Sequence, residues 1–251
     1  MNYENKIPQV ENLNKEIDSL RPLSNDILRQ IKEYYKISYT FSSNAIEGNT
    51  LSESETKIVI EDGLTVAGKP LRDHNEALGH SEAYNHLWTL KENKKITYND
   101  ILDLHKLFFY RISSDEAGKL RNNKVIITGT EYIPPEPIKL EKLLKNAFEN
   151  LELKRGNIHP IALASKAHME IVNIHPFIDG NGRCARLFMN LILLQEGYII
   201  GLIPPILRSD YISIVKDVQL AKKDERFFIN FISNCLYETT KDYLRLLKSL
   251  I

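Results

Sequence analysis

Two segments with apolar residues at helical spacing are joined by the stretch His175-Pro-Phe-Ile-Asp-Gly-Asn-Gly-Arg-Cys-Ala-Arg186. Gly180 and Gly182 flank Asn181 where the second of these helices is expected to begin. Glycine at these positions lets backbone N–H groups face an anion, and the positive end of the helix dipole adds to the attraction. The stretch therefore predicts an anion-binding loop at the amino-terminal end of a helix.

Four side chains of this loop supply charge or a proton acceptor. Arg183 and Arg186 are three residues apart in the first turn of the predicted helix, so both guanidinium groups can reach the same side, where two forks suit a polyphosphate. Asp179 places a carboxylate beside those phosphates, an arrangement that suits Mg²⁺ shared between one acid and phosphate oxygens. His175, with an ordinary pKa near neutrality, is the candidate general base. Together they predict transfer of a phosphorus-containing group from a nucleotide.

Outside the loop, apolar residues recur at threes and fours, which predicts a mostly α-helical fold. Ser24 is the expected N-cap of the first predicted helix, and Gly63 ends the second. Residues 124–135 are rich in β-branched residues, carry a turn signal at Gly129 and predict one β-hairpin flap leaning on the helices. The expected helices span residues 24–47, 51–63, 73–91, 97–111, 139–153, 160–174, 183–196, 209–221 and 224–250.

Composition limits the class of protein. The 251 residues are 43% hydrophobic and 26% charged, which excludes a disordered chain and allows one large domain or two small ones. The 33 Lys and Arg residues balance 33 Asp and Glu residues, which argues against a dedicated nucleic-acid binder. Two cysteines without metal-ligand spacing, no signal peptide at the start and no uninterrupted apolar span predict a cytoplasmic protein that does not enter the membrane.

The loop resembles the signature of the Fic family, His-x-Phe-x-Asp/Glu-Gly-Asn-Gly-Arg-x-x-Arg, at every specified position. The resemblance covers about residues 96–198 and implies a Fic/Fido helical fold with a small β-hairpin flap. The implied organisation is an N-terminal helical region (1–92), a Fic core with flap and signature loop (93–200), and C-terminal helices packed on that core (201–251). The implied activity is AMPylation, in which AMP moves from ATP to a hydroxyl of a protein side chain and pyrophosphate is released.

The resemblance also implies roles for the first part of the loop. His175 would deprotonate the target hydroxyl. Asp179 would hold Mg²⁺, with Mn²⁺ as the alternative ion, between the α- and β-phosphates of ATP. Phe177 would be buried and anchor the loop. His168, seven residues before His175 and on the same helix face, is expected to be a packed or hydrogen-bonded structural histidine.

The second part of the loop would bind ATP, by the same resemblance. The backbone at Gly180, Asn181 and Gly182 would surround the α-phosphate, with the Asn181 side chain contributing. Arg183 would bind the outer phosphates, and Arg186 the γ-phosphate. Relatives with lysine at the position of Gly182 are associated with phosphorylation, so glycine there indicates adenylylation.

The predicted flap is a candidate docking edge for the target protein. An extended edge beside a phosphate site can pair with the main chain of a target segment and leave the modified side chain over His175. The resemblance implies docking of this kind, and a hairpin that only covers the core is the alternative that the sequence leaves open. The candidate docking residues are Val125, Ile126, Ile127, Thr128, Gly129 and Thr130.

The first predicted helix ends in Ser43-Asn-Ala-Ile-Glu-Gly-Asn49. Gly48 suits the position after a helix end, but the Glu47 carboxylate opposes the helix dipole unless a cation lies nearby. The segment resembles the inhibitory motif Ser/Thr-x-x-x-Glu-Gly/Asn of Fic proteins. That resemblance implies that Glu47 pairs with Arg186, removes the partner of the γ-phosphate and makes the enzyme self-inhibited. Some relatives use this glutamate to position a water that removes AMP, so a deAMPylating hydrolase is an alternative.

Two further alternatives stay open. A Fic-type transferase could use another nucleotide donor, such as UTP, GTP or a CDP-linked group. A helical partner protein could bind nucleotide without catalysis, although the intact His175 argues against it. The expected partners are ATP and an unidentified target protein, with self-AMPylation as the first expectation, a homodimer as a further option and no nucleic acid.

Overall fold

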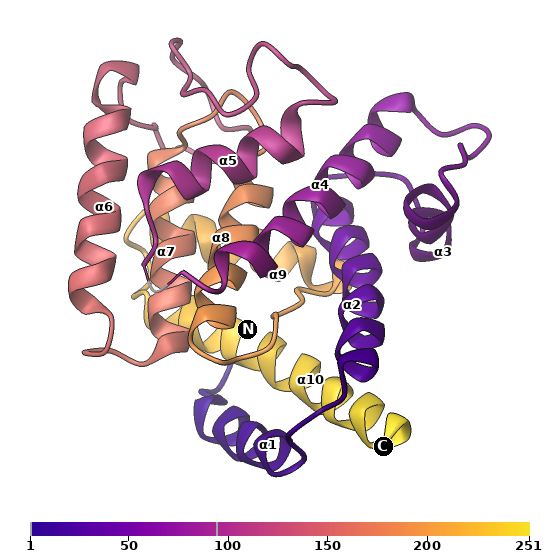
Figure 1. Ribbon diagram of the computed structural model, residues 1–251. Helices are drawn as coiled ribbons and strands as arrows, with labels where there is room; N and C mark the ends of the chain where they lie inside the picture. The colour runs from indigo at the N-terminus through magenta and orange to yellow at the C-terminus, as the bar shows by residue number, and fades with distance from the viewer. Residues whose placement is uncertain (1, 94) are drawn as a thin grey trace.

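The computed structural model describes residues 2–93 and 95–251, and within them the fold is helical (Figure 1). Along the chain lie α1 (Ile7–Ser19), α2 (Asn25–Ile46), α3 (Glu53–Lys57), α4 (Leu71–Leu90), α5 (Tyr98–Phe109), α6 (Leu140–Lys154), α7 (Pro160–Ile174), α8 (Asn181–Gln195), α9 (Arg208–Gln219) and α10 (Arg226–Leu250). A π-helical turn η1 (Ile58–Asp62) and two 3₁₀ turns, η2 (Pro137–Lys139) and η3 (Pro205–Leu207), complete the set. The predicted fold class is confirmed.

Local capping explains where several helices begin. The Ser24 side chain accepts a hydrogen bond from the backbone N–H of Ile27 at 3.2 Å, as expected of an N-cap at α2. Ser52 and Glu55 form a reciprocal capping box at α3, where the sequence predicts a helix start. Gly63 follows the π turn in the left-handed conformation (φ 65°), which ends the helix as predicted.

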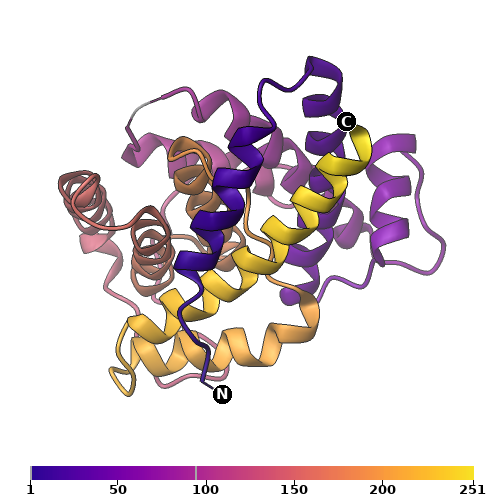
Figure 2. The ribbon, with the colours of Figure 1, turned by 90° about the horizontal axis from the view of Figure 1, so that it is seen from below.

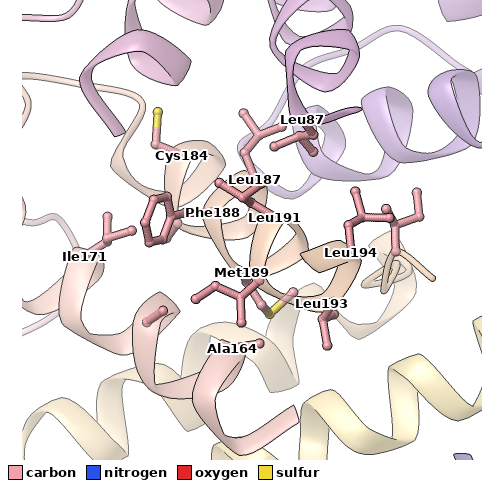
Figure 3. Close-up of a cluster of buried hydrophobic side chains, with 14 of the residues drawn as sticks. Leu87, Ala164, Ile171, Cys184, Leu187, Phe188, Met189, Leu191, Leu193 and Leu194 are labelled. Atoms are coloured by element: carbon pink, nitrogen blue, oxygen red, sulfur yellow. The ribbon is translucent and has the colours of Figure 1, made fainter. Parts of the chain in front are cut away.

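Helix α8 occupies the centre of the molecule. Thirteen of its fifteen residues are buried, and α7 lies beside it along the hydrophobic core. Figure 3 shows Phe188 of α8 close to Ile171 of α7, with Leu87 of α4 on another side of α8. One continuous core cluster runs from Val10 to Leu247, so α1 and α10 also contribute to it. These two helices contact each other and lie side by side in Figure 2. The division into three ranges stays a prediction, since all three contribute to this core.

The predicted β-hairpin flap is wrong. Residues 121–136 form a loop with a turn at Gly129, and the part of the chain that the structure describes contains no strand. No backbone–backbone hydrogen bond joins the two arms of this loop; Arg121 donates to the carbonyl of Pro135 at 2.7 Å, and Lys216 donates to the carbonyl of Gly129 at 3.0 Å. A two-stranded hairpin is marginal in water without a third strand, so side-chain anchors hold the loop instead.

Within the described residues, no helix has both the length and the apolar character needed to cross a bilayer.

Candidate active site

The predicted anion-binding loop connects α7 to α8. His175 ends α7 in a left-handed conformation (φ 49°, ψ 59°), which turns the chain out of the helix. Gly180 is also left-handed (φ 79°), and a Cβ atom added to it would lie 2.8 Å from Cε1 of Phe108. Both the conformation and the close contact therefore require glycine at position 180. Helix α8 begins at the next residue. Its first backbone N–H groups have no helical acceptor, as in any helix, and no N-cap side chain accepts from them either.

The loop is closed by hydrogen bonds between Asn181 and Phe177. The amide Nδ2 of Asn181 donates to the Phe177 carbonyl, and the Phe177 N–H donates to Oδ1 of Asn181, both at 2.9 Å. The Phe177 ring is fully buried and stacks on His105, with ring centroids 3.7 Å apart. The expectation of a buried anchor at Phe177 is confirmed. The Asn181 side chain is engaged within the loop, which leaves backbone N–H groups to face an anion.

His175 has the environment of an uncharged imidazole. Burial lowers its pKa to about 4, and the nearby charge of Arg121 acts in the same direction. Arg121 also donates a hydrogen bond from Nε to the His175 carbonyl at 2.8 Å, and its own N–H donates to the carbonyl of Pro176 at 2.9 Å. The ring is thus neutral near pH 7 and able to accept a proton, and Arg121 ties the His175 loop to residues 121–136.

Asp179 provides one ionised and accessible carboxylate. Burial alone would raise its pKa, but the charges of Arg183 and Arg72 and a hydrogen bond from the Gly180 N–H hold that pKa below its usual range. The Gly180 N–H lies 2.6 Å from Oδ1, and Nη2 of Arg72 lies 2.5 Å from Oδ2. In the described part of the chain, no three His, Cys, Asp or Glu side chains gather as a metal cage. One carboxylate is the donor set that Mg²⁺ takes when phosphate oxygens and waters complete its shell, so Asp179 fits this ion.

Arg186 is buried to 1% exposure at the start of α8 and is held from α2 and α9. Its Nε donates to Oγ of Ser43 at 3.0 Å, its Nη2 to the Ser43 carbonyl at 2.8 Å, and its Nη1 to the Tyr211 hydroxyl at 3.1 Å. The Nη2 atom also lies 2.8 Å from Oε1 of Glu47, the residue that follows α2. The structure thus brings Ser43 and Glu47 together with Arg186, which lies 143 residues after Ser43 in the sequence.

The Glu47 carboxylate lies above the first turn of α8. A Cβ atom built on Gly182 would be 2.4 Å from Oε1 of Glu47. Burial acts to raise the pKa of Glu47, but the charges of Arg186 and Arg183 outweigh it and hold that pKa below its usual range. Gly48 follows with φ 96°, a conformation that suits glycine after a helix end. An internal anion therefore occupies the positive end of α8.

Arg183, the other arginine of the loop, is paired with a buried acid on α4. Its Nη1 lies 2.9 Å from Oε1 of Glu76, and its guanidinium carbon lies 4.5 Å from the centre of the Phe108 ring. Glu76 also accepts from Nε of Arg72 at 3.0 Å and from Nδ2 of Asn49 at 2.9 Å. Glu76 thus links Arg183 to the segment just after Glu47.

Sequence reasoning singled out neither Glu76 nor Arg72, nor Arg121 and His105. Glu76 lies in the predicted helix 73–91 and Arg72 just before it, four residues apart, a spacing typical of exposed ion pairs. The burial of Glu76 against α8 depends on the packing of α4, which no local pattern reports. The one sequence signal available was that Arg72 and Glu76 share a helix face near the polar residues Asp73 and Asn49.

The remaining predicted site residues divide into two groups. His168 is fully buried, stacks on Phe228 and shares a 2.8 Å hydrogen bond with the Tyr211 hydroxyl, so its structural role is confirmed. The docking residues Val125 to Thr130 lie in the loop after Arg121, where Ile126 is 94% exposed. Their role in target docking stays a prediction.

Comparison with known proteins agrees with this geometry. A family model described as "Fic/DOC family" matches residues 95–193. "Protein adenylyltransferase Fic" of Nematostella vectensis is 36% identical and covers 97% of this chain and 59% of its own; the protein of that name from Drosophila melanogaster is 36% identical, with 94% and 48% covered. This chain thus spans about half the length of the curated relatives it matches.

Solved structures give the same family. "Fic-1 (aa134 - 508)" from C. elegans superposes with a TM-score of 0.86 at 30% identity, covering 97% of this chain and 72% of that one. A Fic-domain-containing signalling protein from Bacteroides thetaiotaomicron, at 24% identity and a TM-score of 0.85, shares the fold. The resemblance stated from the signature loop is confirmed, and the chain belongs to the Fic/DOC family.

Proposed function

We propose that this chain is a protein adenylyltransferase that moves AMP from ATP to a hydroxyl group of a protein side chain. The oxygen of the target hydroxyl would bond to the α-phosphorus of ATP, the bond from that phosphorus to the pyrophosphate oxygen would break, and His175 would take the hydroxyl proton. The observation that carries the proposal is a neutral His175 beside an uncapped helix end with two buried arginines and one accessible carboxylate. The names of the curated relatives support the same reaction.

The residues of the loop divide the work on ATP. Backbone N–H groups at the start of α8, from Gly180 to Gly182, would bind the α-phosphate with the helix dipole. Arg183 and Arg186 would bind the outer phosphates as charge-assisted hydrogen-bond donors. The negative charge of the bound phosphates would raise the pKa of His175 from about 4 toward neutrality, where a general base works best.

Asp179 would hold Mg²⁺, which would supply positive charge to offset the negative charge of the phosphates. Arg72, now paired with Asp179, has a side chain that is 55% exposed and can withdraw into solvent. Residues of this chain would then hold the ion through a single carboxylate, and ATP would supply the remaining charged ligands.

We infer that Glu47 restrains this activity. Its carboxylate is paired with Arg186 at 2.8 Å and lies over Gly182, in the space that a phosphate needs. Two anions repel each other at one helix end, so productive ATP binding requires Glu47 to leave. The enzyme would therefore alternate between a state with Glu47 paired and a state with ATP bound.

Intact-mass measurements on four proteins test the proposal with ATP and Mg²⁺. Glu47→Gly is expected to gain an adenylyl group quickly, the wild type slowly, and His175→Ala not at all. Glu82→Gln is the matched control, because Glu82 on α4 pairs with Arg111 at the surface and should behave as the wild type. Parallel reactions with GTP, UTP and CTP identify the donor. Absence of AMP from Glu47→Gly and from every protein of an added cell extract would contradict the proposal.

A further inference from the structure

A second cavity of about 540 Å³ lies outside the site described above. None of its lining residues belongs to the loop from His175 to Arg186. Its walls come from the first half of α2, the carboxyl end of α4, the end of α8 with the segment after it, and α10, all labelled in Figure 1. The volume is in the range of pockets that hold small molecules.

Five of the sixteen residues that line the cavity are aromatic. Tyr35 and Tyr243 stack with centroids 5.9 Å apart, and Tyr84 meets Trp88 edge to face at 6.2 Å. Tyr198 contributes a further ring, and aliphatic side chains fill the spaces between them. Surfaces of this kind bind a planar aromatic body by stacking and edge-to-face contacts.

Two ammonium groups border this aromatic surface. Nζ of Lys32 lies 5.4 Å from the centre of the Trp88 ring, and Nζ of Lys91 lies 5.5 Å from it. In the residues that the structure describes, neither ammonium has a carboxylate at ion-pair distance. Burial also lowers the pKa of Lys32, a cost that an anion beside it would offset.

The other charged groups that line the cavity already have partners. Each is neutralised by a residue three positions away in the chain, so the positive charge of Lys32 and Lys91 is the part left to attract a ligand. The pairs are Arg21 with Asp18 at 3.0 Å, Arg29 with Asp26 at 2.5 Å, and Glu33 with Lys36.

We propose that this cavity binds a small aromatic carboxylate. The ring packs among the tyrosines and Trp88, and the carboxylate accepts hydrogen bonds from Lys32 and Lys91. Two flexible lysines without a backbone N–H nest suit a compact carboxylate better than a polyphosphate. Binding of such a ligand can be measured whether or not the protein transfers AMP.

A ligand in this cavity would contact α2, which ends just before Glu47, and α8, which carries Arg186. Helix α2 lines the cavity near Lys32 and ends just before Glu47, and α8 lines it at Leu194 and carries Arg186 at its other end. Binding is measured first, by a readout that does not involve the loop.

The chain has a single tryptophan, Trp88, so its fluorescence reports on this cavity alone. The probe is 4-phenylbutyrate, which does not absorb where tryptophan is selectively excited, and 4-phenylbutyramide is the uncharged match. We expect a saturable change in Trp88 emission, and calorimetric affinities at least about tenfold higher for the carboxylate, the ratio that one good charged contact gives.

A double variant, Lys32→Gln with Lys91→Gln, is expected to reduce that preference to less than about threefold. The control is Lys142→Gln with Lys222→Gln, which removes the same charge from two exposed lysines outside the cavity and should keep the full preference. Circular dichroism checks that both variants fold. Equal affinity for the carboxylate and the amide, no saturable change, or an unaltered preference in the Lys32/Lys91 variant would each overturn the proposal.

Discussion

Gly182 lies directly beneath the carboxylate of Glu47, so closely that an added Cβ would be 2.4 Å from Oε1. Gly182 is a residue of α8 with helical backbone, where alanine is normally more stable than glycine by about 0.5–1 kcal/mol. The nearest atom to such a Cβ belongs to Glu47, the side chain that also pairs with Arg186, and Nη1 of Arg186 follows at 3.3 Å.

Gly182→Ala is therefore expected to have opposite effects in two backgrounds. With Glu47 present it should lower the free energy of unfolding, because the methyl group displaces the carboxylate from Arg186. In a Glu47→Gly background it should raise the free energy of unfolding by about 0.5–1 kcal/mol, as for an ordinary helical position. Urea unfolding of the four proteins of this cycle measures the coupling, and additive effects would mean that Glu47 does not occupy this space.

Removing the buried acid Glu76 is expected to destabilise the fold by about 3 kcal/mol. Glu76→Gln leaves the guanidinium of Arg183, which is 3% exposed, without its nearest acid. Glu82→Gln on the same helix removes a surface partner of Arg111 and should cost less than about 1 kcal/mol. Equal losses in the free energy of unfolding for the two variants in urea would show that the Glu76 network does not stabilise the fold.

The loop of residues 121–136 is expected to loosen when Arg121 becomes lysine. The Arg121 guanidinium joins three carbonyls, those of His175, Asn123 and Pro135, at 2.7–2.9 Å. Lysine keeps the charge but cannot make this fork of bonds. Limited proteolysis should cut Arg121→Lys within the loop well before the wild type, whereas Arg111→Lys, at the surface just after α5, should be cut at the wild-type rate.

Acid is expected to destabilise the protein before its carboxylates are protonated. Burial lowers the pKa of His105 and His175 to about 4 and those of His80 and His168 well below the ordinary 6.5. Below pH 6.5 the unfolded chain takes up protons that the folded chain refuses, so each histidine lowers the free energy of unfolding by about 1.4 kcal/mol per pH unit.

Urea unfolding between pH 7 and pH 5 measures this slope. The slope should be shallower for His168→Gln, which removes one such histidine, than for the wild type. A free energy of unfolding that stays constant over this range would contradict the assignment of neutral, buried histidines.

Helix ends were predictable because their signals are local. Ser24 and Gly63 act through bonds and backbone angles of their own segments, and both behave as the sequence indicates. Helix α1 also has a local signal, with Val10 and Ile17 buried on one face, although the sequence analysis assigned no helix there. That signal was available and was missed.

The flap and the charge network were not predictable in the same way. The β-branched residues before Gly129 favour a strand, but a strand forms only when a second strand pairs with it. The described residues contain no strand that could do so. The Glu47–Arg186 contact was reached through a family resemblance, because no spacing relates residues 139 positions apart. No family resemblance pointed to Glu76. Its pairing with Arg183 depends on the packing of α4 against α8, which the sequence pattern does not show.

Because α8 is buried, loss of activity in a variant of this helix can reflect loss of the fold. Arg186 is among the largest fully buried side chains, and its loss would strip the cation from Ser43, Tyr211 and Glu47 at once. An inactive Arg186 variant would thus confound lost chemistry with lost abundance in the cell, since a misfolded protein is degraded. His175, at the rim of the core, offers the cleaner knockout for genetics.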